Sequence, residues 1–190
     1  MIEAELVLTD PPYGIDYKAG DSSQRGIQNF ERVEGDNKPF DPEPLLRFDD
    51  VICWGANHYA KRLPETEGQL YCWDKVCQNG MKVRIAECEY AWHRKGTKPR
   101  VFRHLWSGAY RASESGERSL HPTQKPVALM SWCLRIAGDV KTVVDPYMGS
   151  GTTLVACKRA CVRVVGIEVN ESYCEKAANR LRQGVLPFAG

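Results

Sequence analysis

The 190-residue sequence lacks several features that would place it in a special class of protein. No uninterrupted apolar run approaches the roughly 20 residues that a membrane-spanning helix requires. The N-terminus, Met1-Ile2-Glu3-Ala4-Glu5, is acidic rather than basic, which is not typical of a secretory signal. A net charge of +2 neither requires nor excludes a polyanionic partner. We therefore expect a cytoplasmic protein without a membrane span, with residues 1–190 forming one domain around a proper core.

The chain also lacks the cysteine spacing of a structural metal site. None of its eight cysteines forms a Cys-x-x-Cys pair, and most lie within apolar runs. A disulfide framework is not expected in a chain with this much core. The pattern predicts reduced, buried thiols and no bound metal.

A polar turn follows the first apolar run of the sequence. Residues 4–9 are predicted as a buried strand, and Asp10-Pro11-Pro12-Tyr13 comes directly after it. In open α/β sheets, ligands bind at the carboxyl ends of the strands. The two prolines lack N–H donors, so this turn offers a carboxylate, free carbonyls and an aromatic ring. Such a site suits a flat ligand with an NH₂ group, such as the exocyclic amine of a nucleobase.

A second turn follows the strand Thr142–Asp145 and opens a helix. Its sequence, Pro146-Tyr147-Met148-Gly149-Ser150-Gly151-Thr152-Thr153, lets the backbone approach a ligand closely at the glycines. It has neither the Gly-Lys-Ser/Thr ending of a Walker motif nor the spacing Gly-x-Gly-x-x-Gly. Glu168 ends the next predicted strand, 162–167, and lies 23 positions after Asp145 (168 − 145). A carboxylate at that point holds a ribose diol in doubly wound folds, so the sequence predicts a nucleoside site without a phosphate to bind.

The remaining pattern predicts a long loop and several further elements. Residues 14–40 form the loop, which is rich in Gly, Ser, Asp, Asn and Gln. Residues 94–120 are basic and irregular, with aromatic residues interleaved, and we keep two interpretations: a solvated surface segment, or a small recognition insert that contacts phosphates and bases. The other predicted elements are a short helix within 41–48, a strand at 51–55, a short helix at 57–62, β-rich runs at 69–73 and 86–93, and a helix from Pro122 to Ala137.

Three motifs in this order resemble those of the amino-methylating DNA methyltransferases. They are Asp10-Pro11-Pro12-Tyr13, the segment 121–126 (His-Pro-Thr-Gln-Lys-Pro) and the turn 145–153. Because the catalytic turn precedes the cofactor turn, the order is similar to that of the beta group, and residues 54–59 and 106–121 are similar to phage and prophage members. The resemblance implies a circularly permuted, Rossmann-like, three-layer α/β/α methyltransferase fold with a small DNA-recognition insert at about 75–120. It also implies S-adenosylmethionine as cofactor and double-stranded DNA as partner.

The same resemblance implies a role for each matching residue. Asp10 and the Pro11 carbonyl would accept hydrogen bonds from the target NH₂, with Pro12 completing the rigid turn and Tyr13 stacking on the base. Thr123 and Lys125 would close over the methionine carboxylate and amine of the cofactor, whereas for His121 a packing role is as plausible as a ligand role. The other cofactor-binding residues would be Asp145, Pro146, Tyr147, Gly149, Ser150, Gly151 and Thr152 around the methionine end, and Glu168 on the ribose.

Three functions remain open. The leading interpretation is methylation of adenine at N6, because cytosine-N4 enzymes more often carry Ser in place of Asp10. Cytosine-N4 methylation is the first alternative. The second is an inactive DNA-binding remnant with a damaged cofactor site.

The sequence departs from the family pattern at its beginning. Family members of this order carry a further strand and an acidic Gly-Asp turn upstream, whereas here the first strand begins within five residues of Met1. We therefore expect a chain that lacks one edge strand and holds the cofactor adenine by apolar walls and backbone groups. Losing one hydrogen bond to a buried polar edge costs about 1–3 kcal/mol, which predicts weak cofactor binding. The segment Val162–Ile167 would then be an exposed sheet edge available for homodimer pairing.

Overall fold

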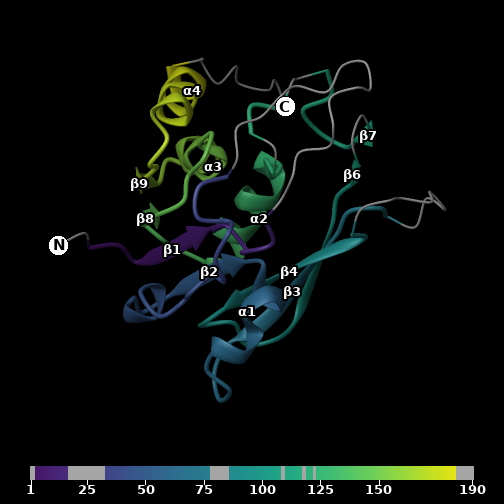
Figure 1. Cartoon of the computed structure of the whole chain (residues 1–190), viewed down its shortest axis with the longest axis vertical. Helices are drawn as coiled ribbons and strands as arrows, with labels where there is room; N and C mark the ends of the chain where they lie inside the picture. The colour runs from purple at the N-terminus through teal and green to yellow at the C-terminus, as the bar shows by residue number, and fades with distance from the viewer. Residues whose placement is uncertain are drawn as a thin grey trace.

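The computed structural model describes residues 3–16, 33–77, 86–107, 110–116, 119–121 and 123–182. These residues form a mixed α/β fold around a seven-stranded sheet of order β5-β3-β4-β2-β1-β8-β9 (Figure 1). The strands of this sheet are β1 (Leu6–Thr9), β2 (Val51–Trp54), β3 (Gln69–Asp74), β4 (Cys88–His93), β5 (Arg100–Arg103), β8 (Thr142–Asp145) and β9 (Arg163–Gly166). A separate two-stranded sheet pairs β6 (Trp106–Ser107) with β7 (Tyr110–Arg111). The helices are α1 (Ala56–Tyr59), α2 (Val127–Ala137), α3 (Thr152–Arg159) and α4 (Glu171–Arg182), with 3₁₀ segments at Leu45–Arg47 and Ala60–Arg62.

Strand β1 lies at the centre of the parallel part of the sheet. It pairs in parallel with β2 on one side and with β8 on the other, and β8 pairs in parallel with β9. Every residue of β1 is buried, as expected for a parallel strand that is covered on both faces. Because β1 and β8 are adjacent and parallel, the turns that follow them emerge at the same edge of the sheet. The topology therefore brings the two predicted ligand turns together.

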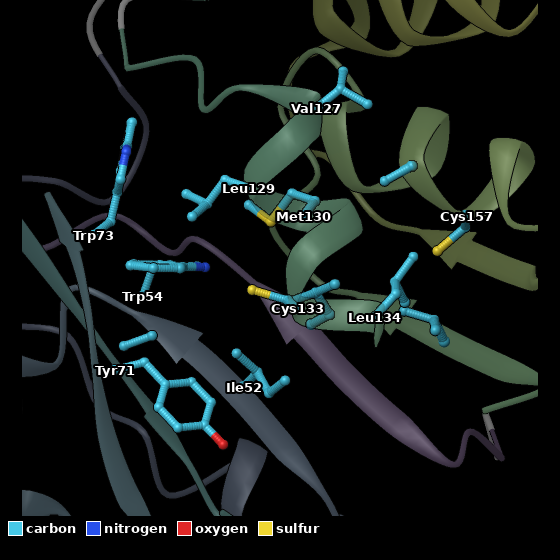
Figure 2. Close-up of a cluster of buried hydrophobic side chains, with 14 of the residues drawn as sticks. Ile52, Trp54, Tyr71, Trp73, Val127, Leu129, Met130, Cys133, Leu134 and Cys157 are labelled. Carbon is cyan, nitrogen blue, oxygen red and sulfur yellow. The ribbon is translucent and has the colours of Figure 1, made fainter. Parts of the chain in front are cut away.

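The two faces of the sheet bury separate hydrophobic clusters. Alternate residues of β1 divide between them: Leu6 and Leu8 face α2 and α3, whereas Val7 packs with Phe40 and Tyr59 on the opposite face. Figure 2 shows the first cluster, in which side chains of α2 pack against the large residues of β2 and β3. Helical segments therefore cover both faces of the sheet, as expected for a Rossmann-like methyltransferase fold.

The predicted strands are confirmed, but the helix predicted from Pro122 to Ala137 is wrong at its start. Helix α2 begins at Val127, with Pro126 as its N-cap in an extended conformation (ψ 142°). A proline disfavours helical geometry in the residue before it, so Lys125 cannot continue a helix into Pro126. Pro122 itself lies outside the described residues.

Several other expectations are narrowed by the structure. The helix expected within 41–48 is a 3₁₀ segment of three residues, Leu45–Arg47, and the strand expected from Ala86 begins at Cys88. Of the long loop 14–40, residues 17–32 lie outside the described residues. The stretch 94–120 is less irregular than expected, since it contains β5, β6 and β7. Because β4 lies inside the main sheet and β5 at its end, a recognition role within 75–120 would fall to the segments outside the sheet and to the exposed side chains of β5.

Strand β9 is at one end of the described sheet, consistent with the exposed edge expected for 162–167. Its neighbourhood is partly apolar, with Val165 47% and Ile167 44% exposed. Pairing of two copies through this edge stays a prediction. Among the cysteines, Cys53, Cys133 and Cys157 are buried as expected, but Cys161 is exposed. Within the described residues, no helix is both long enough and apolar enough to cross a membrane.

Candidate active site

A pocket of about 500 Å³ lies at the carboxyl ends of β1 and β8. Both predicted turns line it, together with the end of β9 and the segment before α2. Tyr13 and Gly151, two of the predicted site residues, do not line this pocket. The predicted residues that do line it are Asp10, Pro11, Pro12, Thr123, Lys125, Asp145, Pro146, Tyr147, Gly149, Ser150, Thr152 and Glu168.

Asp145 connects the two turns. Its carboxylate accepts a hydrogen bond from the Thr9 hydroxyl at 2.6 Å and another from the Tyr147 N–H at 3.1 Å. Burial raises the pKa of Asp145 to about 6, although hydrogen bonds from Thr153, Thr9 and the Tyr147 N–H oppose the rise. A buried, hydrogen-bonded carboxylate of this kind fixes the turn after β8 relative to the end of β1.

Asp10 is the centre of a hydrogen-bonded network. The Tyr13 hydroxyl donates to Oδ1 of Asp10 at 2.5 Å, and the Lys125 ammonium donates to Oδ2 at 2.6 Å. The ammonium also donates to the Tyr13 hydroxyl oxygen at 3.1 Å. Burial raises the pKa of Asp10 and Glu89 raises it further, while Lys125 lowers it. Burial and the nearby carboxylates raise the pKa of Tyr13 well above its usual value, so its hydroxyl stays a donor.

The network continues to two residues that the sequence analysis missed, Glu89 and Lys75. Glu89 is on β4, with Oε2 3.1 Å from the Lys125 ammonium and Oε1 2.7 Å from the Lys75 ammonium. Burial alone would raise the pKa of Glu89, but the two ammonium groups outweigh it and lower that pKa to about 2. At Lys125, burial would lower the pKa, but the carboxylates of Asp10 and Glu89 outweigh burial and raise that pKa. The sequence signal for Glu89 was weak, because Glu89 is one of two acidic residues, with Glu87, inside the β-rich run 86–93.

Tyr13 is held by the segment after β2. Its ring stacks on His58, with centroids 4.8 Å apart and planes 15° apart. Gly55 makes the close approach possible, because a Cβ at that position would lie 2.0 Å from the Tyr13 ring. Gly55 also has a left-handed φ of +81°, which few residues other than glycine adopt. One face of the Tyr13 ring is therefore occupied by His58, so the predicted stacking of Tyr13 on a base would require the opposite face of the ring.

The glycines of the second turn have different surroundings. Gly151 is the N-cap of α3 at φ +80°, and a Cβ there would lie 2.8 Å from the Cβ of Ala177 on α4. Gly151 therefore acts through helix packing rather than through the pocket wall. Gly149 does line the pocket, and its N–H donates to Glu168 Oε2 at 2.9 Å. The Asn170 N–H donates to Oε1 of the same carboxylate at 2.9 Å, so Glu168 is fixed with unused lone pairs available to a diol.

His121 and Thr123 contact each other at the wall formed by the segment before α2. The Thr123 hydroxyl lies 3.1 Å from His121 Nδ1, and the His121 ring packs against Tyr173 at 4.6 Å. Burial, with Lys125 and Lys176 nearby, lowers the pKa of His121 to about 4, so the ring is neutral. Both residues line the pocket, and the contact with Tyr173 gives His121 a packing role.

The described residues hold no group of three or more His, Cys, Asp or Glu side chains arranged to bind a metal ion. What the pocket provides is the carboxylate of Asp10 with adjacent carbonyl acceptors, and a second carboxylate, that of Glu168, which is fixed by backbone N–H groups. This arrangement can orient an amine and a nucleoside in one cavity.

Comparison with known proteins gives a consistent result. The sequence model of the N6_N4_Mtase family, described as DNA methylase, matches residues 48–179. The chain is 25% identical over 218 residues to the type II methyltransferase M.HpaI of Haemophilus parainfluenzae, covering 93% of this chain and 68% of that protein. The fold is similar to that of the M1.HpyAVI–SAM complex, with a TM-score of 0.58, 23% identity and coverage of 96% and 90% of the two chains. It is also similar to the cytosine-N4-specific PvuII DNA methyltransferase, with a TM-score of 0.58, 15% identity and coverage of 96% and 81%.

Proposed function

The chain belongs to the N6/N4 DNA methylase family, and on this premise we propose that it transfers a methyl group from S-adenosylmethionine to N6 of adenine in double-stranded DNA. The observation that carries the proposal is the shared pocket at the carboxyl ends of β1 and β8. Asp10 and Pro11 line it from one side, and Gly149 and Glu168 line it from the other. An amine acceptor site and a nucleoside site are therefore open to the same cavity.

The residues of the first turn act on the target amine. An aryl amine is a poor nucleophile because its lone pair is delocalised into the ring. Hydrogen bonds from its two protons to the Asp10 carboxylate and the Pro11 carbonyl favour a pyramidal nitrogen whose lone pair is free. The same acceptors stabilise the positive charge that develops on the nitrogen as the new N–C bond forms. Asp10 then lies where it can accept the proton that the methylated nitrogen loses.

The residues of the second turn orient the cofactor, which when bound supplies an electrophilic methyl group on a sulfonium. Glu168 accepts hydrogen bonds from the two ribose hydroxyls, a role for which its fixed carboxylate is suited. The methionine end of the cofactor is surrounded by residues of the second turn, and Thr123 closes over it. These residues are Asp145, Pro146, Tyr147, Ser150 and Thr152. Lys125 lines the same pocket, but its ammonium is paired with Asp10 and Glu89.

We extend the proposal to the DNA contact. The segments of 75–120 outside the main sheet carry an aromatic–basic pair, in which the Arg111 guanidinium lies over the Trp106 ring at 4.3 Å. Tyr110 beside them is 62% exposed. Trp106 is itself part of the buried core, so the groups that suit contacts with phosphates and unstacked bases are the Arg111 guanidinium and the exposed Tyr110 ring.

A methyl-transfer assay tests the proposal. Radiolabelled methyl transfer from S-adenosylmethionine to genomic DNA is measured for the wild type, for Asp10→Ala, and for Asp139→Ala as a matched control. The Asp139 side chain is 84% exposed. We expect transfer by the wild type and the control but not by Asp10→Ala. Nucleoside mass analysis is expected to find N6-methyladenine.

Cytosine-N4 methylation is the second candidate function, because the same two acceptors can bind the 4-amino group of cytosine. Detection of N4-methylcytosine in place of N6-methyladenine would establish it. DNA binding without any methyl transfer by the wild type would instead identify an inactive remnant, the third alternative.

A further inference from the structure

Both oxygens of Asp10 are already occupied in the structure. Oδ1 accepts from the Tyr13 hydroxyl at 2.5 Å, and Oδ2 accepts from the Lys125 ammonium at 2.6 Å. The Asp10 side chain is 16% exposed and that of Lys125 is 6% exposed, so water does not readily replace either partner. If Asp10 is to accept a proton of a substrate amine, one of these partners must leave it. The ammonium is the one with a second carboxylate within reach.

That second carboxylate is Glu89. Its position on β4, opposite Trp73 on β3, turns it toward the face of the sheet that α2 covers. The Lys75 ammonium donates to Oε1 at 2.7 Å and itself lies 5.4 Å from the Trp73 ring centroid. Oε2 lies 3.1 Å from the Lys125 nitrogen, yet no donor within the described residues reaches it with hydrogen-bond geometry. Glu89 is therefore held at one oxygen and has acceptor capacity at the other, directed at Lys125.

We propose that Glu89 is a positioning residue that receives the Lys125 ammonium when a substrate amine takes its place on Oδ2 of Asp10. This inference rests on the proposed function. In the exchange, an amine N–H donates to Asp10, and a Lys125 N–H turns to Glu89. The exchange involves no proton transfer, and no covalent bond forms or breaks. The buried ammonium keeps a carboxylate partner throughout, so the exchange avoids the large cost of an unpaired buried charge.

By pairing with Lys125, Glu89 also leaves the negative charge of Asp10 uncompensated by the ammonium during methyl transfer. With Lys125 paired to Glu89, the Asp10 carboxylate faces the positive charge that develops on the amine. Without Glu89, Asp10 is the remaining carboxylate partner of Lys125 and the ammonium stays on it. The titratable groups that face Asp10 are Tyr13 on its own turn, Cys53 on β2, Tyr59 on α1, Glu89 on β4, Lys125 before α2 and Asp145 on β8.

A double-mutant cycle on the full chain tests the inference. The rate constants kcat and the KM values for DNA and cofactor are measured for the wild type, Glu89→Gln, Lys125→Gln and the double variant. We expect Glu89→Gln to lower kcat by about tenfold with little change in the KM for cofactor. The double variant is expected to exceed Glu89→Gln in kcat, because the cation that blocks Asp10 is gone. A double variant that is no faster than Glu89→Gln overturns the proposal.

The conservative variant Glu89→Asp separates charge from packing. The shorter aspartate side chain keeps a carboxylate for Lys125 but at a greater distance from the ammonium. The kcat of Glu89→Asp is therefore expected to lie between those of the wild type and Glu89→Gln. An exposed pair supplies the control: Glu67, 3.0 Å from Arg94, is changed to Gln with no expected effect on kcat. If Glu89→Asp is no more active than Glu89→Gln, the side chain contributes only packing and the proposal fails.

A measurement that does not depend on methyl transfer distinguishes this inference from the proposed function. The Asp10 carboxyl is titrated by NMR of carboxyl-labelled aspartate, with Asp10→Asn for assignment. Because Glu89 raises the pKa of Asp10 and Lys125 lowers it, Glu89→Gln is expected to shift that pKa downward. A shift without any wild-type methyl transfer supports the pairing and contradicts the proposed function. Wild-type transfer with an unshifted Asp10 pKa in Glu89→Gln contradicts the inference alone.

Discussion

The Thr9 hydroxyl donates a hydrogen bond of 2.6 Å to the Asp145 carboxylate, joining the ends of two adjacent parallel strands that are 136 residues apart in sequence. Thr9 is fully buried and Asp145 is 2% exposed. Thr9 is followed directly by Asp10, and Asp145 by the turn that leads to Gly149. One buried hydrogen bond therefore fixes the distance between the proposed amine site and the proposed cofactor site.

Removing this hydrogen bond is expected to affect stability and cofactor binding together. Thr9→Val keeps the shape but leaves a buried oxygen of Asp145 without one donor, which costs about 1–3 kcal/mol of unfolding free energy. Chemical denaturation measures the loss, and calorimetry is expected to show weaker cofactor binding. Thr142→Val at the half-buried start of β8 is the control, because it removes a hydrogen bond from the Glu5 N–H away from the pocket, and an equal loss there would mean that the Thr9 contact has no special role.

The pH dependence of stability should report the buried state of Asp145. Its folded pKa of about 6 is above the ordinary aspartate pKa of 3.8, so the folded protein holds this proton more tightly than the unfolded chain does. The contribution of Asp145 to stability therefore falls as the pH rises from about 4 to about 6, by up to about 3 kcal/mol, and is constant above that. Denaturation curves of the wild type and Asp145→Asn should diverge across this window. Parallel pH profiles would contradict the raised pKa.

The contact between Gly55 and Tyr13 predicts a sharp steric effect. Gly55→Ala places a methyl group 2.0 Å from the Tyr13 ring, so the ring must move from its position beside His58 and Asp10. We expect a loss of most methyl-transfer activity, measured with labelled cofactor. Gly116→Ala is a matched control, because Gly116 has nearly the same φ, +83°, but no atom within 4 Å of its Cβ position. Similar losses in both variants would show that backbone strain, rather than the Tyr13 ring, is responsible.

Glu168 is expected to contribute strongly to cofactor affinity. Glu168→Ala removes a charged acceptor for two ribose hydroxyls and also the partner of the Gly149 N–H. Hydrogen bonds to charged groups are each worth about 1.5–3 kcal/mol, which predicts a dissociation constant at least about tenfold higher. Isothermal titration calorimetry measures it. Glu171→Ala, at the exposed start of α4, should leave the affinity unchanged, and an equal effect there would argue against a specific role for Glu168.

How far the sequence predicts this molecule depends on how local each signal is. Asp10 and Gly149 could be placed because each follows an apolar strand, and parallel strands end at one edge of a sheet. The pairing of Lys125 could not be predicted, because its partner Glu89 is 36 positions earlier (125 − 89) on a strand whose two faces both carry apolar residues. The predicted start of α2 at Pro122 is wrong for a local reason. Pro126 is extended and caps the helix, so the helix begins only at Val127.

The proposed DNA contact is best tested by its salt dependence. Arg103 on β5 is within 75–120 and its side chain is 64% exposed, at the edge of the sheet away from β9. If it contacts a phosphate, Arg103→Ala should weaken DNA binding and reduce the slope of log affinity against log salt by about 0.9. Arg159, exposed at the end of α3 and outside that stretch, provides the control Arg159→Ala. Fluorescence anisotropy at several salt concentrations measures both slopes. An unchanged slope for Arg103→Ala would remove β5 from the DNA-binding surface, because the release of bound counterions depends on each lost phosphate contact whatever the base sequence.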